Sequence, residues 1–449
     1  MQWCTNHITK KEFPHAKFKQ LVKNYSGSRS RVDLFRLGLH GFADFIVPYT
    51  PTTWSSTWAQ PESVWNYVVR LLNYMSIIDD AISQPTALAV HSELVPLWPT
   101  VWFWCQALHE MNVLARMSGY GQEEQSIRDP ARYSRSACQT RHAALLKALK
   151  GFSHHKPPTK LSILVNGTDG FIAMLAQLWI DEGRYAIWAG NSNSRREALY
   201  GFKAGSLIHT LDGGRASETS VDLVAQIITS CGGAEAAVEV LFQRVQNNLA
   251  QSSVCLQSFT VDLLLLNGQI LRRTESGDAL LPALVGHSRT VSFLVETLYS
   301  LLIHIRHMRL ATDILCMPLL AITSLIRQTN AYSTISQLLD TRFFEVMAYV
   351  VPLCSAKTQD MTGPCKDLLH NLLPRYTVFR SLFVRMQRSF SNSGASFDRK
   401  FKPGGLAFES TLAACRGLFR EYQSAPSYTL QCSNPEVNDQ HPLRPKTPI

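Results

Sequence analysis

The chain has few charged residues for its length, and it is rich in hydrophobic residues. Asp, Glu, Lys and Arg make up 17% of its 449 residues, whereas folded proteins usually contain about 25%. Hydrophobic residues make up 45%, which excludes a disordered chain and provides for a sizeable core. At about 150 residues per domain, the length allows up to three domains or one long one.

Membrane-directing segments are also lacking. Residues 1–13 are polar, and Lys10 and Lys11 precede any apolar run, so we predict no signal peptide. A bilayer span needs about 20 apolar residues, but the two best runs, Leu94–Leu108 and Ala311–Ile326, are shorter and contain proline. We therefore expect two buried helices there, no membrane span, and an intracellular location in the cytoplasm or nucleus.

The cysteines and glycines do not form known site motifs. Ten cysteines are scattered from Cys4 to Cys432, with no two closer than eleven residues. A disulfide scaffold needs dense cysteines in a short chain, and a zinc knuckle needs C-x-x-C pairs. Neither G-x-x-x-x-G-K-[ST] nor G-x-G-x-x-G occurs, so no phosphate loop is predicted by motif.

Positive charge is concentrated towards the two ends of the chain. Lys and Arg number 44 against 34 Asp and Glu, and residues 1–36 and 370–420 carry net charges of +6 and +7. Basic surfaces attract nucleic acid, so association with nucleic acid through the basic ends is one alternative function. Four arginines alternate with phenylalanines at one of these ends: Arg375, Arg380, Arg385 and Arg388. Their spacing distributes them around a helix. This favours the solvated face of a core helix over a helix that binds in a groove of nucleic acid.

The dominant positive signal is helical periodicity. Apolar residues three and four apart form stripes over residues 64–82, 291–308, 372–390 and 408–422, and each stripe lies on one face of a helix. We expect Ser63 to cap the first helix and Pro374 to begin or kink the third. Alternation with period two is nearly absent, so a sheet is not expected.

A helix pair is clearest in the middle of the chain. Thr219 or Ser220 can cap a helix that Gly232-Gly233 ends, and a second stripe begins at Val238. A helix, a tight turn and a helix in about 32 residues is the unit of α-solenoids. No residues match at a fixed period, so any repeats have diverged beyond recognition.

We therefore predict an all-α protein, an array of antiparallel helix pairs resembling an irregular α-solenoid. Its helical body spans residues 31–425, with a mobile insert at about 389–405. Residues 1–30 form a basic arm, and residues 426–449 form a disordered, proline-rich tail.

An acidic pair and a polar triplet suggest one enzymatic alternative. Asp79-Asp80 ends an amphipathic stripe, and Asn191, Ser194 and Glu197 follow about 110 residues later. In an all-α chain this resembles the two magnesium-binding motifs of terpene synthases. Glu197, however, falls one position too early, which turns it about 100° away on a helix. We favour a solvated helix end and keep a magnesium-dependent, terpene synthase-like lyase as an alternative.

Two further groups carry weaker signals. Gly286-His287-Ser288-Arg289-Thr290 matches part of a nucleophile elbow, but no strand is expected before it, and Ser288 fits a helix cap better. His304 and His307 could share a helix face, but Asp313 lies six residues further on and a third ligand at helical spacing is missing. We predict no catalytic, cofactor-binding or metal-binding residue, and no cofactor.

The region from residue 368 to residue 436 resembles a known family. It contains in order Leu368-Leu369-His370-Asn371-Leu372-Leu373, Tyr376-Thr377-Val378-Phe379-Arg380-Ser381, the stripe of 408–422, and Gln431-Cys432-Ser433-Asn434-Pro435-Glu436. These strings are similar to those of large basidiomycete fungal proteins in which a long helical region precedes a MYND-type zinc finger. The resemblance implies that Cys432 is the first zinc ligand. Val437 stands where the next cysteine is expected and no later cysteine occurs, so we expect the finger to be truncated or lost.

The leading functional hypothesis is a protein-interaction scaffold, because stacked helix pairs offer an extended surface and need no catalytic residues. We expect its partners to be other proteins.

Overall fold

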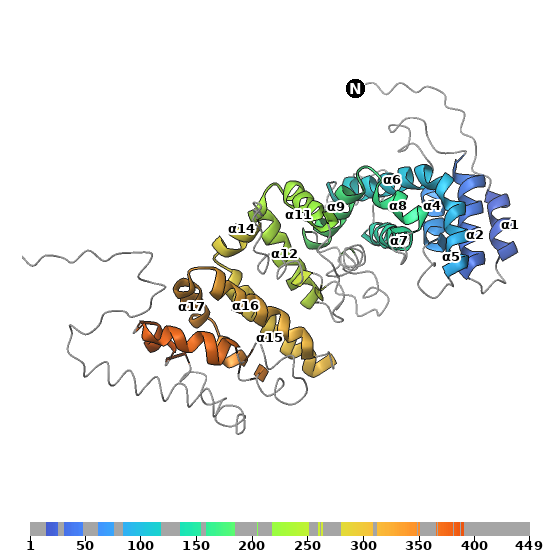
Figure 1. Cartoon of the computed structure of the whole chain (residues 1–449). Coiled ribbons are helices and arrows are strands. Elements are labelled where there is room, and N and C mark those ends of the chain that lie inside the picture. Colours follow the sequence, from blue (N-terminus) through green and yellow to red (C-terminus); the bar gives the residue numbers. More distant parts are fainter. Residues whose placement is uncertain are drawn as a thin grey trace, which may run out of the picture. The chain divides into compact units, whose positions relative to one another are not determined.

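The computed structural model describes the helical parts of the chain and several short pieces between them (Figure 1). The described residues are 15–25, 31–47, 62–75, 84–117, 135–153, 159–184, 204, 218–250, 259–260, 262–263, 280–308, 312–347, 349–350, 365, 367–379, 381–386 and 388–389. Of these residues 92% are helical and none is in a strand. The predicted all-α class is therefore confirmed.

The chain divides into two compact units, Met1–Ser288 and Arg289–Ile449. The first unit contains α1 (His15–Tyr25), α2 (Arg31–Gly41), α4 (Glu62–Met75), α5 (Gln84–Leu94), α6 (Trp98–Met117), α7 (Arg135–Ser153), α8 (Lys160–Asn166), α9 (Phe171–Arg184), α11 (Glu218–Cys231), α12 (Ala234–Leu249) and α14 (Leu280–Gly286). The second contains α15 (Thr290–Met308), α16 (Cys316–Gln328) and α17 (Ala331–Leu339). Short π- or 3₁₀-helical turns lie at Phe42–Ile46, Val95–Leu97, Thr312–Leu315, Asp367–Leu372 and Leu373–Val378.

The first two predicted stripes are buried where the structure describes them. On α4 the buried residues include Val64, Val68, Leu71 and Met75, and on α15 they include Val291, Leu294, Leu298 and Leu301. Ser63 lies inside α4, which begins at Glu62, so the predicted cap is wrong. Ile78, Ile82 and the stripe of 408–422 lie outside the described residues.

The third stripe does not form one continuous helix. A π-helical turn over Asp367–Leu372 passes into a 3₁₀ turn over Leu373–Val378, and the backbone is extended at Phe379, with ψ 108°. Helix resumes at residues 381–386. Pro374 sits at the start of the 3₁₀ turn, where its missing N–H breaks the α-helical ladder. The helix was predicted to begin or kink at Pro374; the type of helical turn changes there, but the break in the helix lies at Phe379.

The predicted helix pair is present as α11 and α12. Gly232 and Gly233 separate the helices with φ of 86° and 136°, a region that favours glycine. Gly233 donates its N–H to the Ile228 carbonyl and thereby closes the end of α11. Thr219 and Ser220 lie within α11 rather than before it, so they are not caps.

Helix α2 packs on α1, α4 and α5 at the N-terminal end of the first unit (Figure 1). An added Cβ would lie 2.5 Å from Met75 Cγ at Gly38 and 2.4 Å from Leu71 Cδ2 at Gly41. These two glycines therefore allow α2 and α4 to approach closely. Helix α1, within the predicted basic arm, packs Phe18 against Phe45, with ring centres 5.5 Å apart.

Helix α8 is held at both ends by hydrogen bonds. Thr159 Oγ1 accepts from the Ser162 N–H (3.1 Å), and Ser162 Oγ accepts from the Thr159 N–H (2.8 Å), which forms a capping box. Thr159 Oγ1 also lies 3.1 Å from Nδ1 of His91 on α5. At the other end, Trp98 Nε1 donates to Thr168 Oγ1 (2.8 Å).

Replacing Thr159 by alanine should destabilise α8 by about 1–2 kcal/mol, because it removes the cap and leaves the buried His91 ring without that bond. Thr159→Ser keeps the hydroxyl and should therefore retain most of the stability of α8. Asn330→Ala, which removes the cap that Asn330 Oδ1 provides to Ser333 at the exposed start of α17, should cost about 0.5–1 kcal/mol. Hydrogen exchange of peptides from α8 and α17 measures both effects. Equal losses would show that the bond to His91 contributes nothing.

Candidate functional site

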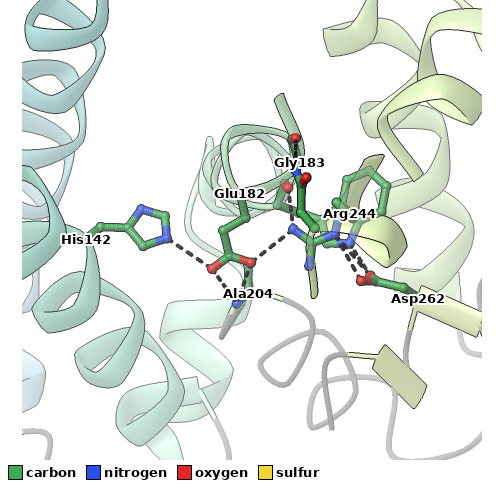
Figure 2. A network of polar contacts seen from close by, with 8 residues as sticks. His142, Glu182, Gly183, Ala204, Arg244 and Asp262 are labelled. Atoms are coloured by element: carbon green, nitrogen blue, oxygen red, sulfur yellow. Dashed lines mark hydrogen bonds and ion pairs between the residues drawn. The ribbon is translucent and has the colours of Figure 1, made fainter. Parts of the chain in front are cut away.

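The most unusual feature of the first unit is a cluster of ionisable side chains in its interior (Figure 2). Glu182, Arg244 and Asp262 have no exposed surface, and His142 retains 4%. These residues come from α9, α12, the short piece at 262–263, and α7. Buried charges are tolerated only where they are paired and hydrogen-bonded, so their partners define what the cluster does.

Glu182 is at the centre of the cluster. Its Oε1 lies 3.1 Å from His142 Nε2 and accepts from the Ala204 backbone N–H at 3.1 Å. Its Oε2 accepts from Arg244 Nη1 at 3.0 Å. A single carboxylate thus joins α7, α12 and the chain at residue 204, as Figure 2 shows.

Arg244 divides its hydrogen bonds among three acceptor groups. Its Nε donates to Oδ1 and Oδ2 of Asp262 at 3.1 and 3.2 Å. Its Nη1 donates to the Trp179 carbonyl at 2.6 Å as well as to Glu182. The guanidinium carbon also lies 4.6 Å from the centre of the Trp179 ring, within cation–π range. Trp179 is also bonded to Asp262, because its Nε1 donates to Asp262 Oδ1 at 2.8 Å.

The local sequence of α9 makes this arrangement possible. Trp179 and Glu182 are three residues apart and therefore share one helix face. Gly183 follows, and a Cβ there would lie 2.6 Å from Arg244 Cγ and 2.9 Å from Val240 Cγ1. Glycine thus lets α12 approach α9 closely enough for Arg244 to reach Glu182. Asn247 Nδ2 donates to the Gly183 carbonyl at 3.1 Å and adds a second link.

The environment shifts the pKa values of the two carboxyl groups in opposite directions. Burial raises the pKa of Glu182, but the His142 hydrogen bond, the Arg244 charge and the Ala204 N–H outweigh it and leave the pKa below its usual value. At Asp262 burial dominates, and the pKa lies above its usual value despite Arg244 and Trp179. Burial lowers the pKa of Arg244, but the charges of Asp262 and Glu182 outweigh it and raise the pKa, so Arg244 is permanently charged.

The cluster is suited to holding helices together rather than to reacting with a substrate. Its carboxylates and guanidinium are engaged with one another and are fully buried. Within the part of the chain that the structure describes, no group of three His, Cys, Asp or Glu side chains is arranged to hold a metal ion.

Some of the sequence-derived candidates fall on described residues. Ser288 lies in the turn between α14 and α15, and helix precedes it rather than strand, so the nucleophile-elbow geometry is absent there. His304 is on α15 and half-buried. His307 is also on α15 and Asp313 is in the turn Thr312–Leu315, but their side chains are not described. The remaining candidates lie outside the described residues: Asp79, Asp80, Asn191, Ser194, Glu197 and Cys432.

The predicted arginine run is partly paired with acidic side chains. Arg385 contacts Ser336 of α17 and Asp340, the residue that follows α17. Arg375 and Arg388 are exposed, and Arg380 lies outside the described residues. A solvated face with one ion pair to the neighbouring helix fits these placements.

Sequence reasoning did not identify the buried cluster, although two signals were available. Arg244 lies three residues after Leu241, beside the apolar stripe of α12, and Asp181-Glu182 follow the mostly apolar first ten residues of α9. Charged residues on buried helix faces are rare unless they are paired. The pairing itself could not be read, because Glu182 and Arg244 are 62 residues apart.

Comparisons with known proteins give no relative from which a function could be transferred. No family model, curated protein sequence or solved structure matches the chain.

Among the described helices, none alone has the length and apolar character of a membrane span, although α8 with α9 and Leu223–Cys231 with α12 meet that test as bent pairs.

Proposed function

We propose that the protein is a protein-interaction scaffold built on an array of antiparallel helix pairs. The described residues are helices that pack directly on one another, and α9 is contacted by both α11 and α12. The buried charged groups join α7, α9 and α12 to one another and to residue 262. Helical arrays of this kind offer extended surfaces for partner binding.

The observation that carries the proposal is an exposed apolar pair on an anchored helix. Ile163 is 64% exposed and Leu164 38% exposed, although α8 is fixed by the Thr159 cap and by the bond from Trp98 to Thr168. Apolar side chains on a rigid support lose little conformational entropy on binding and are suited to anchoring a partner.

A cross-linked capture of the full chain from its native cells, quantified by mass spectrometry, tests this proposal. We expect a stoichiometric protein partner that survives nuclease treatment and is lost in the double variant Ile163→Asp, Leu164→Asp. Val285→Asp, at a 42% exposed position on α14, is the matched control and should retain the partner. Recovery of nucleic acid alone would instead favour binding through the basic ends. Diphosphate release from prenyl diphosphates with magnesium, abolished by Asp79→Ala, would favour the lyase.

We also infer that the chain is related to the basidiomycete proteins with a long helical region and a MYND-type zinc finger. The support is the order of the strings from Leu368 to Glu436, which ends in Cys432-Ser433-Asn434-Pro435-Glu436. Such a relationship is compatible with a scaffold, since the helical region would then present the binding surface.

A purified chain of residues 1–449 should contain no stoichiometric zinc. A structural zinc site needs four donors, and no cysteine follows Cys432. Elemental analysis after dialysis measures the metal content. One tightly held zinc per chain that is lost in Cys432→Ser would contradict the prediction.

A further inference from the structure

The second unit carries three aromatic rings at its surface. Tyr376 stacks on Phe379 with ring centres 6.3 Å apart, and Tyr332 of α17 meets Phe379 edge-on at 5.6 Å. Tyr332 is 40% exposed, and the other two are half-buried. We refer to these three rings as the aromatic surface. They lie outside the core, which the same part of the chain fills with other side chains: Leu372, Leu373, Leu382, Phe383 and Met386.

Side-chain hydrogen bonds hold the aromatic surface against α17 (Figure 1). Tyr332 Oη lies 2.8 Å from Ser381 Oγ. Four residues further along each segment, Arg385 donates to Ser336 Oγ. Two contacts one helical turn apart therefore fix residues 381–386 beside α17. Rings on such a support need little ordering when a ligand stacks on them.

The part of the chain that carries Tyr376 and Phe379 is basic. Residues 367–389 contain four arginines and one acidic residue, Asp367. Asp367 and Asp340, which follows α17, are both bonded to arginines, so their charges are already balanced. Arg375 and Arg388 are exposed and leave the segment with positive charge at its surface.

We propose that the aromatic surface binds single-stranded nucleic acid. Unpaired bases stack on aromatic rings while their phosphates pair with nearby arginines, and single-strand binding surfaces combine these two contacts. Such a surface differs from a helix in a duplex groove, because it contacts the faces of unpaired bases and the groove helix contacts the edges of paired ones. A partner with negative charge alone, such as polyglutamate, would leave the rings unused. The proposal does not depend on the proposed scaffold function.

Fluorescence anisotropy of the full chain with labelled oligo(U) and oligo(dT) tests the proposal. We expect at least one of them to bind more tightly than a duplex of the same length and than polyglutamate. Tyr332→Ala should weaken binding by about five- to 100-fold, because one stacked base is lost. Tyr332→Phe keeps the ring and should retain most of the affinity.

The salt dependence of binding tests the contribution of arginine separately. In Arg375→Ala the slope of log affinity against log salt concentration should become shallower by about 0.7, the value for one phosphate contact on a single strand. Arg375 is exposed, so this variant is expected to fold. Arg70→Ala, at an exposed position on α4 in the first unit, is the matched control and should leave the slope unchanged.

Ultraviolet cross-linking of bound oligo(U) to the wild-type chain gives a readout that needs no variant to fold. Peptides that contain Tyr332, or Tyr376 and Phe379, should carry the cross-linked nucleotide by mass spectrometry. Four results would overturn the proposal: no binding of either oligonucleotide, equal affinity for the duplex or for polyglutamate, equal binding by Tyr332→Ala and the wild type, or cross-links confined to other peptides.

Discussion

Replacing Arg244 by methionine should lower the free energy of unfolding of α9 and α12 by about 3–5 kcal/mol, because it leaves Glu182 without its cation in a water-free interior. Arg244 is fully buried and bonds to Glu182, Asp262 and the Trp179 carbonyl. Methionine fills part of the vacated volume, so the loss reports mainly on charge. Hydrogen exchange of peptides from α9 and α12 in the full chain gives the local opening free energy.

The matched control is Arg342→Met in the second unit. Arg342 pairs with Glu296 at 2.6 and 3.0 Å, but both side chains are at least a third exposed, and such pairs contribute about 0–1 kcal/mol. Adding Glu182→Gln and Asp262→Asn to Arg244→Met should recover part of the loss, since no charge then remains to be buried. Similar losses for Arg244→Met and Arg342→Met would contradict the structural role of the cluster.

Gly183→Ala should destabilise the contact between α9 and α12 by about 1–3 kcal/mol through overpacking. The added Cβ would lie 2.6 Å from Arg244 Cγ and 3.1 Å from the Val240 carbonyl oxygen, so backbone as well as side chain must move. Alanine is the better helix former by about 1 kcal/mol, and the sign of the measured effect therefore separates packing from propensity.

Gly286→Ala at the end of α14 is the control for propensity alone, because an added Cβ there meets no atom within 4 Å. It should leave the free energy of unfolding unchanged or raise it by up to about 1 kcal/mol. Circular dichroism on denaturant titration, with hydrogen exchange to localise the change, measures both variants. A stabilised Gly183→Ala protein would mean that α9 and α12 are further apart than Arg244 requires.

The helices themselves could be predicted from sequence because a helix face is a local property. The stripes on α4, α12 and α15 are set by residues three and four apart, and their inward faces are buried as expected. Helix ends were harder: Ser63, Thr219 and Ser220 have the chemistry of caps, yet they lie inside α4 and α11. A side chain that can cap a helix does not by itself determine at which residue the helix begins.

The buried cluster could not be predicted because it depends on tertiary contacts. Trp179 and Asp262 are 83 residues apart, and His142 is 40 residues from Glu182. Periodicity indicates which face of a helix is buried but not which helix covers it. The single helix predicted over 372–390 was wrong, because the backbone is extended at Phe379, where a new helical turn begins with the hydrogen bond from the Phe383 N–H to the Phe379 carbonyl.

A double-mutant cycle between Glu182 and Arg244 tests the central claim, that one buried ion pair joins α9 to α12. The opening free energies of these helices would be measured by hydrogen exchange for the wild type, Glu182→Gln, Arg244→Met and the double variant. We predict a coupling energy of about 1–3 kcal/mol, within the range of about 0.5–3 kcal/mol found for residues in one hydrogen-bonded network. Losses that add to within about 0.5 kcal/mol, as they do for distant sites, would show that Glu182 and Arg244 act independently and would contradict the account.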